Sequence, residues 1–460
     1  MTGPLDGDSL RLLATALERL QEGFAHLPPS SQQCDAEGTA RVLLEAAERM
    51  RDNFPYFHPL YAGQMLKPPH PVARLAYALS LWINPNNHAL DGGRASSAME
   101  KEAVAELARM FGWREHLGHL CGGGTMASLE ALWAAGRLRP DGAVAASSQA
   151  HYTHARISAA LRIPFEEIPC DARGRMDPAA LAARLERGGI ATVVATLGTT
   201  AAGAVDPLHE VLALRERHGF RLHVDAAYGG YFTLAGSLAP ETRAAFDRMA
   251  EADSIVIDPH KHGLQPYGCG CVLFRDPAVG ALYRHDSPYT YFTSRELHLG
   301  EISLECSRPG AAAVALWATQ RLLPLVPAGA FARGLDAGRR AALELHRWLA
   351  ADPRFAPGPP PELDIVTWIP HAGDLAAVSA LSRRLFEEAA ARGLHLALAQ
   401  LPAALFPGAP RPPGKSAATV TCLRSVLMKP EHAEWLDRIE AILDQAAGAA
   451  GVHPPGPARR

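Results

Sequence analysis

RLHVDAAYGG at residues 221–230 and SIVIDPHKHG at residues 254–263 each begin with a short apolar run and end in polar residues. Such short apolar runs bounded by turns are typical of buried strands. Similar runs are predicted as strands over 144–146, 191–196 and 270–274. Helical periodicity over 96–111, 125–136, 152–161, 178–187 and 207–219 separates them. This alternation predicts an α/β fold whose central sheet is mostly parallel and covered by helices on both faces.

Two charged side chains follow the two quoted strands. Asp225 ends the first apolar run, and Lys261 comes 36 positions later (261 − 225), shortly after the second. Ligands of such sheets bind beyond the carboxyl ends of the strands, so both residues are expected at one site. A lysine in a buried site can lose its proton and condense with an aldehyde, and an aspartate that faces a pyridinium nitrogen keeps it protonated. The pair therefore suggests pyridoxal phosphate as cofactor.

A glycine-rich stretch, CGGGTMASLEALWAA at residues 121–135, offers a place for the cofactor's phosphate. Gly124 allows close approach of the backbone, and Thr125 begins a predicted helix whose amide end attracts anions. The stretch alone is also compatible with a tight connection that binds nothing. It lacks the GK[ST] sequence of a Walker-type nucleotide loop.

The rest of the chain is divided by changes in pattern. Residues 1–80 are expected to form an N-terminal helical segment, 81–325 a large cofactor-binding domain, 326–450 a small α+β C-terminal domain, and 451–460 a disordered tail. Amphipathic periodicity in the first 50 residues supports the helical segment. Prolines at 55, 59, 68, 69 and 71 predict an irregular connection after it.

Composition narrows the partners. The chain has 460 residues, of which 48% are hydrophobic and 20% charged, and its net charge of −3 leaves no basic excess for nucleic acid. Its seven cysteines form no CxxC pair, and no metal motif occurs, so neither a disulfide framework nor a metal site is predicted. No apolar run is long enough for a membrane span and no signal peptide is recognisable, which predicts a cytoplasmic protein that acts on a small molecule.

HVDAAYGG at residues 223–230 and DPHK at residues 258–261 resemble the group II pyridoxal-phosphate-dependent amino acid decarboxylases, which include aromatic amino acid, glutamate and aspartate decarboxylases. The resemblance extends from about Pro55 to Ile442. It implies the type I fold of the aspartate aminotransferase class. It also implies a homodimer with shared active sites, in which the N-terminal segment packs on the partner.

The resemblance also implies roles for individual residues. Lys261 would form the Schiff base, Asp225 would pair with the pyridine nitrogen, and His151 would stack on the ring and assist proton transfer. The remaining cofactor contacts would be made by Ala227, Gly124, Thr125, His260 and Thr199, and the substrate contacts by Gln64 and Arg424. Tyr289, with Tyr291 as a second candidate, matches the loop tyrosine of decarboxylases that protonates the reacting carbon.

The implied activity is decarboxylation of an L-amino acid with an aromatic, acidic or small polar side chain, through a quinonoid intermediate, to an amine and carbon dioxide. Another type I pyridoxal-phosphate enzyme, namely an aldehyde synthase, lyase or aminotransferase, is the alternative. Asp258 and His262 depart from the family pattern, which often has asparagine and tryptophan there. A carboxylate near a phosphate would need a compensating partner, unless it points away.

Overall fold

The large domain is built on a seven-stranded sheet. The computed structural model describes residues 8–28, 35–284, 297–410 and 418–454. The strand order is β1-β7-β6-β5-β4-β2-β3, and β7 alone runs antiparallel to its neighbours. The strands are β1 (Leu117–Cys121), β2 (Ala143–Ser147), β3 (Phe165–Ile168), β4 (Ile190–Thr196), β5 (Arg221–Asp225), β6 (Ser254–Ile257) and β7 (Gly270–Phe274). The predicted α/β class with a mostly parallel sheet is confirmed.

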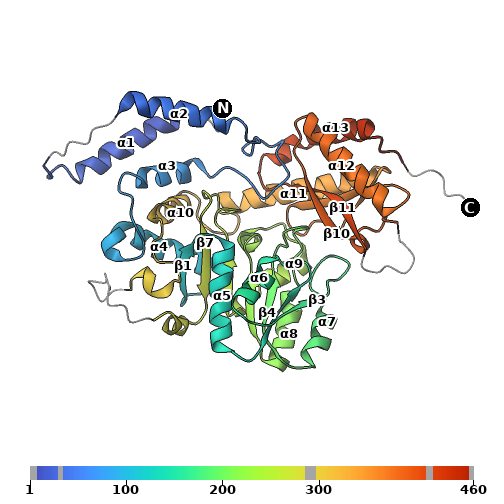
Figure 1. Cartoon of the computed structure of the whole chain (residues 1–460), viewed down its shortest axis with the longest axis horizontal. Helices are drawn as coiled ribbons and strands as arrows, with labels where there is room; N and C mark the ends of the chain where they lie inside the picture. The colour runs from blue at the N-terminus through green and yellow to red at the C-terminus, as the bar shows by residue number, and fades with distance from the viewer. Residues whose placement is uncertain (1–7, 29–34, 285–296, 411–417, 455–460) are drawn as a thin grey trace, which may run out of the picture.

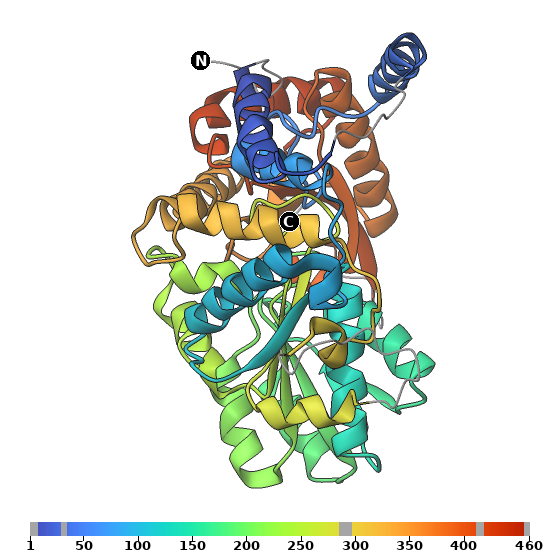
Figure 2. The same ribbon diagram turned by 90° about the vertical axis from the view of Figure 1, so that its left-hand side faces the viewer.

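Helices cover both faces of this sheet (Figures 1 and 2). In β6, Ile255 and Ile257 belong to one buried cluster, whereas Val256 belongs to another beneath α5 (Gly124–Leu138). Successive side chains of a strand point to opposite faces, so a strand buried on both sides reads as a continuous apolar run. α6 (Thr153–Ala160) shares the face of α5. The opposite cluster draws on α4 (Leu90–Met110), α7 (Pro178–Leu185), α8 (Leu208–His218), α9 (Pro240–Phe246) and α10 (Gly310–Leu322).

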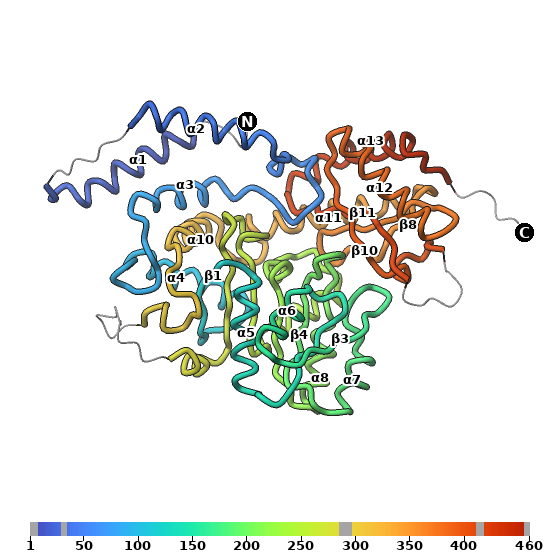
Figure 3. The backbone as a smooth tube through the Cα atoms, in the orientation of Figure 1, coloured from blue at the N-terminus to red at the C-terminus, as the bar shows by residue number. Residues whose placement is uncertain are grey.

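The C-terminal part forms a separate layer of sheet and helices (Figure 3). Its antiparallel sheet has the order β10-β11-β9-β8, from β8 (Phe355–Pro357), β9 (Ile365–Pro370), β10 (Ala397–Pro402) and β11 (Thr419–Val426). The apolar faces of α11 (Ala330–Ala351), α12 (Leu375–Ala391) and α13 (His432–Ala450) pack around the fully buried Trp368. This is an α+β arrangement joined to the large domain through the connection between α10 and α11.

The N-terminal helices α1 (Asp8–Glu22) and α2 (Ala36–Met50) contain no buried residue and lie along the outside of the molecule (Figure 1). α3 (Pro71–Ser80), which packs against α10, arises inside the stretch expected to be irregular. Pro71 occupies the first helical position, where its missing N–H costs nothing, and the His70 ring accepts a hydrogen bond from Val72 N. None of the helices in the described ranges is both long and apolar enough to cross a bilayer.

Candidate active site

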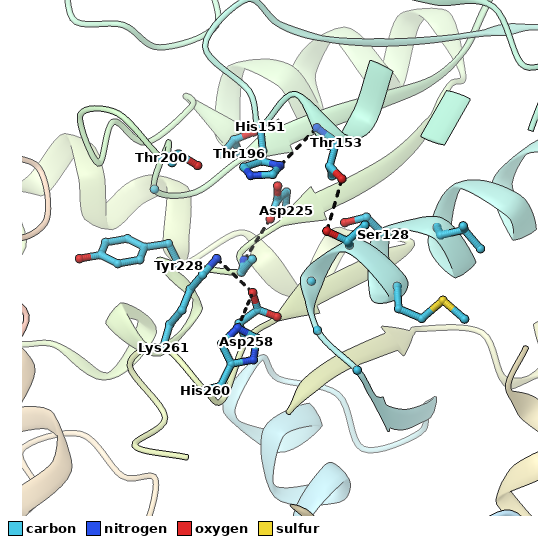
Figure 4. A pocket seen from close by; sticks show the side chains of 18 of the residues that line it. Ser128, His151, Thr153, Thr196, Thr200, Asp225, Tyr228, Asp258, His260 and Lys261 are labelled. Carbon is cyan, nitrogen blue, oxygen red and sulfur yellow. Dashed lines mark hydrogen bonds and ion pairs between the residues drawn. The ribbon is translucent and has the colours of Figure 1, made fainter. Parts of the chain in front are cut away.

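A cavity of about 600 Å³ lies beyond the carboxyl ends of the parallel strands (Figure 4). The segments that follow β1, β4, β5 and β6 supply most of its wall. Its lining includes Gly124, Thr125, His151, Asp225, Ala227, His260 and Lys261. These seven residues, predicted separately from the sequence, are thus brought together in one cavity.

Asp225 is fixed at the end of β5 by two hydrogen bonds. His154 Nε2, on α6, donates to Oδ2 over 2.8 Å, and Ala227 N donates to Oδ1 over 3.1 Å. Burial by itself would raise the pKa of this carboxyl group. The hydrogen bond and charge of His154, the charge of Lys261 and the Ala227 amide outweigh burial and hold the pKa of Asp225 well below its ordinary value. An ionised carboxylate is therefore held ready for a cationic ring nitrogen.

Lys261 lies in the turn after β6, and its side chain reaches into the cavity (Figure 4). Its Nζ is 3.0 Å from Asp258 Oδ2. Asp258 is only 3% exposed and lines the cavity rather than pointing away. In this structure, the lysine amine is thus held by a carboxylate from its own turn.

The two histidines of the cavity have defined tautomers when neutral. Thr153 N donates to His151 Nδ1 over 3.2 Å, so neutral His151 carries its proton on Nε2. His260 Nδ1 lies 2.8 Å from the Cys269 carbonyl oxygen, which can only accept, so neutral His260 carries its proton on Nδ1. Burial lowers the pKa of both rings.

The glycine-rich turn that opens α5 leaves room for an anion. Gly123 has a φ of +149°, and a Cβ on Gly270 of β7 would lie 2.5 Å from its backbone. A Cβ on Gly124 would lie 2.7 Å from Asp258 Oδ2. The free amides at this helix start attract phosphate. With Lys261 and Asp225 in the same cavity, the residues present fit pyridoxal phosphate.

Replacement of Gly124 with alanine is expected to weaken cofactor binding at least about tenfold, because the added methyl group would collide with the Asp258 carboxylate and displace the turn that holds the phosphate. Absorbance titration of the cofactor-free protein with pyridoxal phosphate measures this loss. Gly373→Ala is the matched control, since a Cβ there meets nothing within 4 Å. Equal affinity for Gly124→Ala and wild type would place the phosphate elsewhere.

The structure differs from the sequence prediction at Thr199. This residue is buried and does not line the cavity, and its Oγ1 accepts a hydrogen bond from Ala204 N over 3.0 Å. Its hydroxyl therefore closes the turn after β4. The neighbouring Gly198 and Thr200 line the cavity instead.

Arg424 and Gln64 lie together behind the cavity wall. Arg424, on β11, is 4% exposed and donates to the carbonyl oxygens of Thr200 (2.7 Å), Ala201 (3.1 Å) and Gly63 (3.1 Å). It also donates to Gln64 Oε1 over 3.3 Å. Neither side chain lines the cavity, although Thr200 does. Tyr289 and Tyr291 lie outside the described residues.

Sequence reasoning missed two contributors, His154 and Tyr228, and left the role of a third, His262, open. His154 lies in the first turn of α6, three positions after His151, which precedes this helix, and its Nε2 reaches Asp225. Tyr228 lines the cavity, and its hydroxyl donates to Asp364 Oδ1 over 2.5 Å. His262, where the family pattern often has tryptophan, lies with its Nε2 3.2 Å from Asp364 Oδ2. It therefore supports Tyr228 from behind rather than facing the cavity.

Two of the chain's five lysines donate hydrogen bonds between the segment that carries Gln64 and the C-terminal domain. Lys429 Nζ donates to the Tyr61 carbonyl oxygen over 2.6 Å, and Lys67 Nζ donates to that of Met428 over 3.2 Å. Burial lowers the pKa of Lys429 to about 7 and that of Lys67 to about 8. Both lysines thus join residues 61–67 to the C-terminal domain.

Comparison with known proteins identifies relatives of this chain. A family model described as the pyridoxal-dependent decarboxylase conserved domain matches residues 138–355. The L-tyrosine decarboxylase of Enterococcus faecium is 27% identical over 458 residues, with 75% of each chain covered. A probable L-tyrosine/L-aspartate decarboxylase of Methanocella arvoryzae is 30% identical over 291 residues, which cover 62% of this chain and 74% of the relative.

The fold is shared with solved structures at lower identity. The structure of Oryza sativa TDC with PLP and tryptamine superposes with a TM-score of 0.74, at 19% identity, over 97% of this chain and 99% of that one. At this identity the likeness concerns the fold.

Proposed function

The chain belongs to the pyridoxal-dependent decarboxylase family, and from that premise we propose that it converts an L-amino acid to the corresponding amine and carbon dioxide. The observation that carries the proposal is the placement of Lys261, Asp225 and the Gly124 turn around one cavity. When bound, pyridoxal phosphate supplies a ring that accepts the electrons left on Cα as carbon dioxide departs. Residues of this chain would bind that ring, orient the substrate against it and supply the proton.

Lys261 would hold the cofactor through its Nζ, and the amide end of α5 would hold the phosphate. Asp225 keeps a negative charge at the end of β5, so that a proton on the ring nitrogen stays there. His151 and Ala227 line the same cavity, which restricts the plane the ring can occupy. When the imidazole of His151 is neutral, its Nε2 carries a proton, and this proton is available near the reacting atoms.

We expect the polar groups of the substrate to bind on the Thr200 side of the cavity. Arg424 is a buried guanidinium, and no carboxylate of the described chain lies within ion-pair distance of it. Burial lowers the pKa of Arg424 from its ordinary value, yet arginine remains charged in proteins. Its positive charge behind Thr200 supports roles for Arg424 and Gln64 in attracting a substrate carboxylate.

The substrate side chain is proposed to be aromatic, acidic or small and polar. The relatives are named for L-tyrosine and L-aspartate, which differ in this respect. The cavity offers both characters, since Tyr228, Tyr267 and Leu129 line it together with Thr200, whose carbonyl oxygen accepts a hydrogen bond from Arg424. An assay of purified holoenzyme against these amino acids, glutamate, cysteine sulfinate and 2,4-diaminobutyrate, with carbon dioxide and amine measured together, tests the proposal. Equal amounts of both products support it, and cofactor binding without carbon dioxide from any of them refutes it.

Tyr289 is proposed as the residue that returns a proton to Cα, a role assigned from the sequence resemblance alone. Tyr289→Phe is expected to lower amine formation at least about tenfold, because a positioned general acid is worth about 10² or more in rate. Aldehyde, ammonia and peroxide should be measured beside the amine, since an unprotonated carbanion can react with oxygen. Tyr291→Phe tests the second candidate for this role and is expected to keep the wild-type amine yield. An unchanged amine yield in Tyr289→Phe would remove this assignment.

The proposed active form is a homodimer in the cytoplasm. α1 and α2 expose Leu10, Leu12, Val42, Leu43 and Leu44, each by more than half of its surface. Apolar residues clustered in this way are unusual on the solvent-exposed surface of a monomeric protein. A second copy of the chain would cover such helices. Sedimentation analysis measures the mass of the assembly, and a monomer at micromolar concentration would contradict the dimer.

A further inference from the structure

Asp258 places a buried carboxylate beside the glycine-rich turn. Its Oδ2 lies 3.0 Å from Lys261 Nζ and 3.6 Å from His260 Nε2, and the ion pair with Lys261 is visible in Figure 4. Its Oδ1 is buried without a hydrogen-bond partner in the described structure. A Cβ on Gly124 would lie 2.7 Å from Oδ2, so the carboxylate sits directly against the first turn of α5. An anion held at this turn is therefore close to Asp258.

Asp258 is paired with Lys261 only while the Nζ of that lysine is free, at 3.0 Å. Lys261 would bond the cofactor's aldehyde carbon with loss of water, and its nitrogen can keep one proton, but Nζ then belongs to the cofactor and no longer pairs with Asp258. The phosphate brings up to two further negative charges. Two buried like charges repel strongly at a low effective dielectric constant. The loaded site then has an excess of negative charge that the free site does not have.

The groups facing Asp258 offer few ways to correct this excess. Tyr231, Tyr267, Cys269 and Cys271 already hold their protons, and burial raises the pKa of each. Burial lowers the pKa of His151, and the charge of Asp225 opposes this effect more than the charge of Asp258 does. Glu305 adds a further negative charge at the turn, because its Oε2 accepts a hydrogen bond from Gly122 N over 3.2 Å. Asp258 with His260, and Glu305, are left as groups that can take up a proton. Asp258 is 3% exposed whereas Glu305 is only partly buried, so an added negative charge is less screened at Asp258.

His260 reaches Asp258 in a way that permits proton sharing. Its Nδ1–H is committed to the Cys269 carbonyl, so the neutral ring directs a lone pair from Nε2 toward Asp258 Oδ2. These two acceptors are 3.6 Å apart, which is within ion-pair distance but longer than a hydrogen bond, so one added proton would convert the pair into an attractive contact that can shorten. A proton there would join the ring to the carboxylate, whether it is nearer to nitrogen or to oxygen.

We propose that Asp258 and His260 together take up one proton from solvent when the phosphate of the cofactor binds. This proton comes from water and is additional to the protons exchanged when Lys261 bonds the aldehyde, a bond that pyridoxal forms as well. Cofactor affinity should fall about tenfold more per pH unit than it would without this uptake, because one proton enters with the ligand. The proposal concerns cofactor loading and does not depend on which reaction follows.

Titration calorimetry of the cofactor-free protein at pH 8, in buffers of different ionisation enthalpy, counts the protons taken up. At this pH a phosphate ester is already a dianion in solution. Wild type is expected to take up one proton more with pyridoxal phosphate than with pyridoxal, which lacks the phosphate. Asp258→Asn should give equal counts with the two ligands. Glu305→Gln should retain the wild-type difference of one proton.

Three results would overturn the proposal. Equal proton counts for the two ligands in wild type would show that the phosphate needs no proton. A difference that survives in Asp258→Asn would place the proton on the phosphate or elsewhere. A difference lost in Glu305→Gln, and not in Asp258→Asn, would assign it to Glu305. The wild-type comparison needs no variant to fold and no substrate, so failure to find decarboxylation would leave this result intact.

Discussion

Lys261→Ala is expected to abolish amine formation, with a loss of at least about 10⁵-fold in kcat. Held covalently at the end of β6, the reacting group has an effective concentration far above that of free cofactor, and this advantage is lost with the amine. The fold should persist because Lys261 is partly exposed and makes one ion pair, with Asp258. Amine formation at saturating cofactor, together with circular dichroism, measures both effects.

Lys261→Arg separates the charge of this residue from its reactivity. A guanidinium keeps a positive charge beside Asp258, but it stays protonated and cannot condense with an aldehyde. This variant is expected to match wild type in stability and Lys261→Ala in its lack of activity. If either variant retained more than about a hundredth of wild-type activity, Lys261 would not be the residue that bonds the cofactor.

The sequence predicted the centre of the sheet better than its margins. β5 and β6 are short apolar runs with polar residues at their ends, and burial on both faces allows little else. β3 (FEEI) lies at the sheet edge, where its first three side chains are not fully buried, and its two adjacent glutamates hide the strand pattern. α3 was missed because Pro71 was read as a break in structure, although a proline is well suited to the first position of a helix.

Some residues of the candidate site could likewise be predicted from the sequence, and others could not. The resemblance and the strand ends together indicated Asp225, Lys261 and the Gly124 turn, since their placement follows from the backbone. The roles of Thr199 and Thr200 could not be separated by sequence, because neighbouring residues of one turn differ only in which way they point. The sequence left the direction of Asp258 open between two possibilities, and only its contacts with Lys261 and Gly124 decide between them.

Asp225→Asn is expected to lower kcat about 10³-fold, with a smaller effect on KM. An amide is neutral, so the ring nitrogen would lose the charge that keeps it protonated, and the cofactor would accept electrons poorly. The substitution also disturbs the buried contacts, because Ala227 N and His154 Nε2 both donate to the carboxylate. An asparagine can accept through only one oxygen, so the free energy of unfolding should fall by about 1–3 kcal/mol.

His154→Gln provides the matched comparison, because it leaves the Asp225 carboxylate in place and removes the ring that holds it. We expect a loss of about tenfold in kcat, well below that of Asp225→Asn, since a partner that fixes orientation contributes less than the charge itself. Without His154, the pKa of Asp225 should rise, because the hydrogen bond and charge of His154 are the largest of the effects that lower it. The variant should therefore lose activity at a higher pH than wild type as the solution is acidified. A kcat within tenfold of wild type for Asp225→Asn would mean that another group holds the proton on the cofactor's ring nitrogen. If the acid side of the pH–activity profile did not shift in His154→Gln, His154 would not control the ionisation of Asp225.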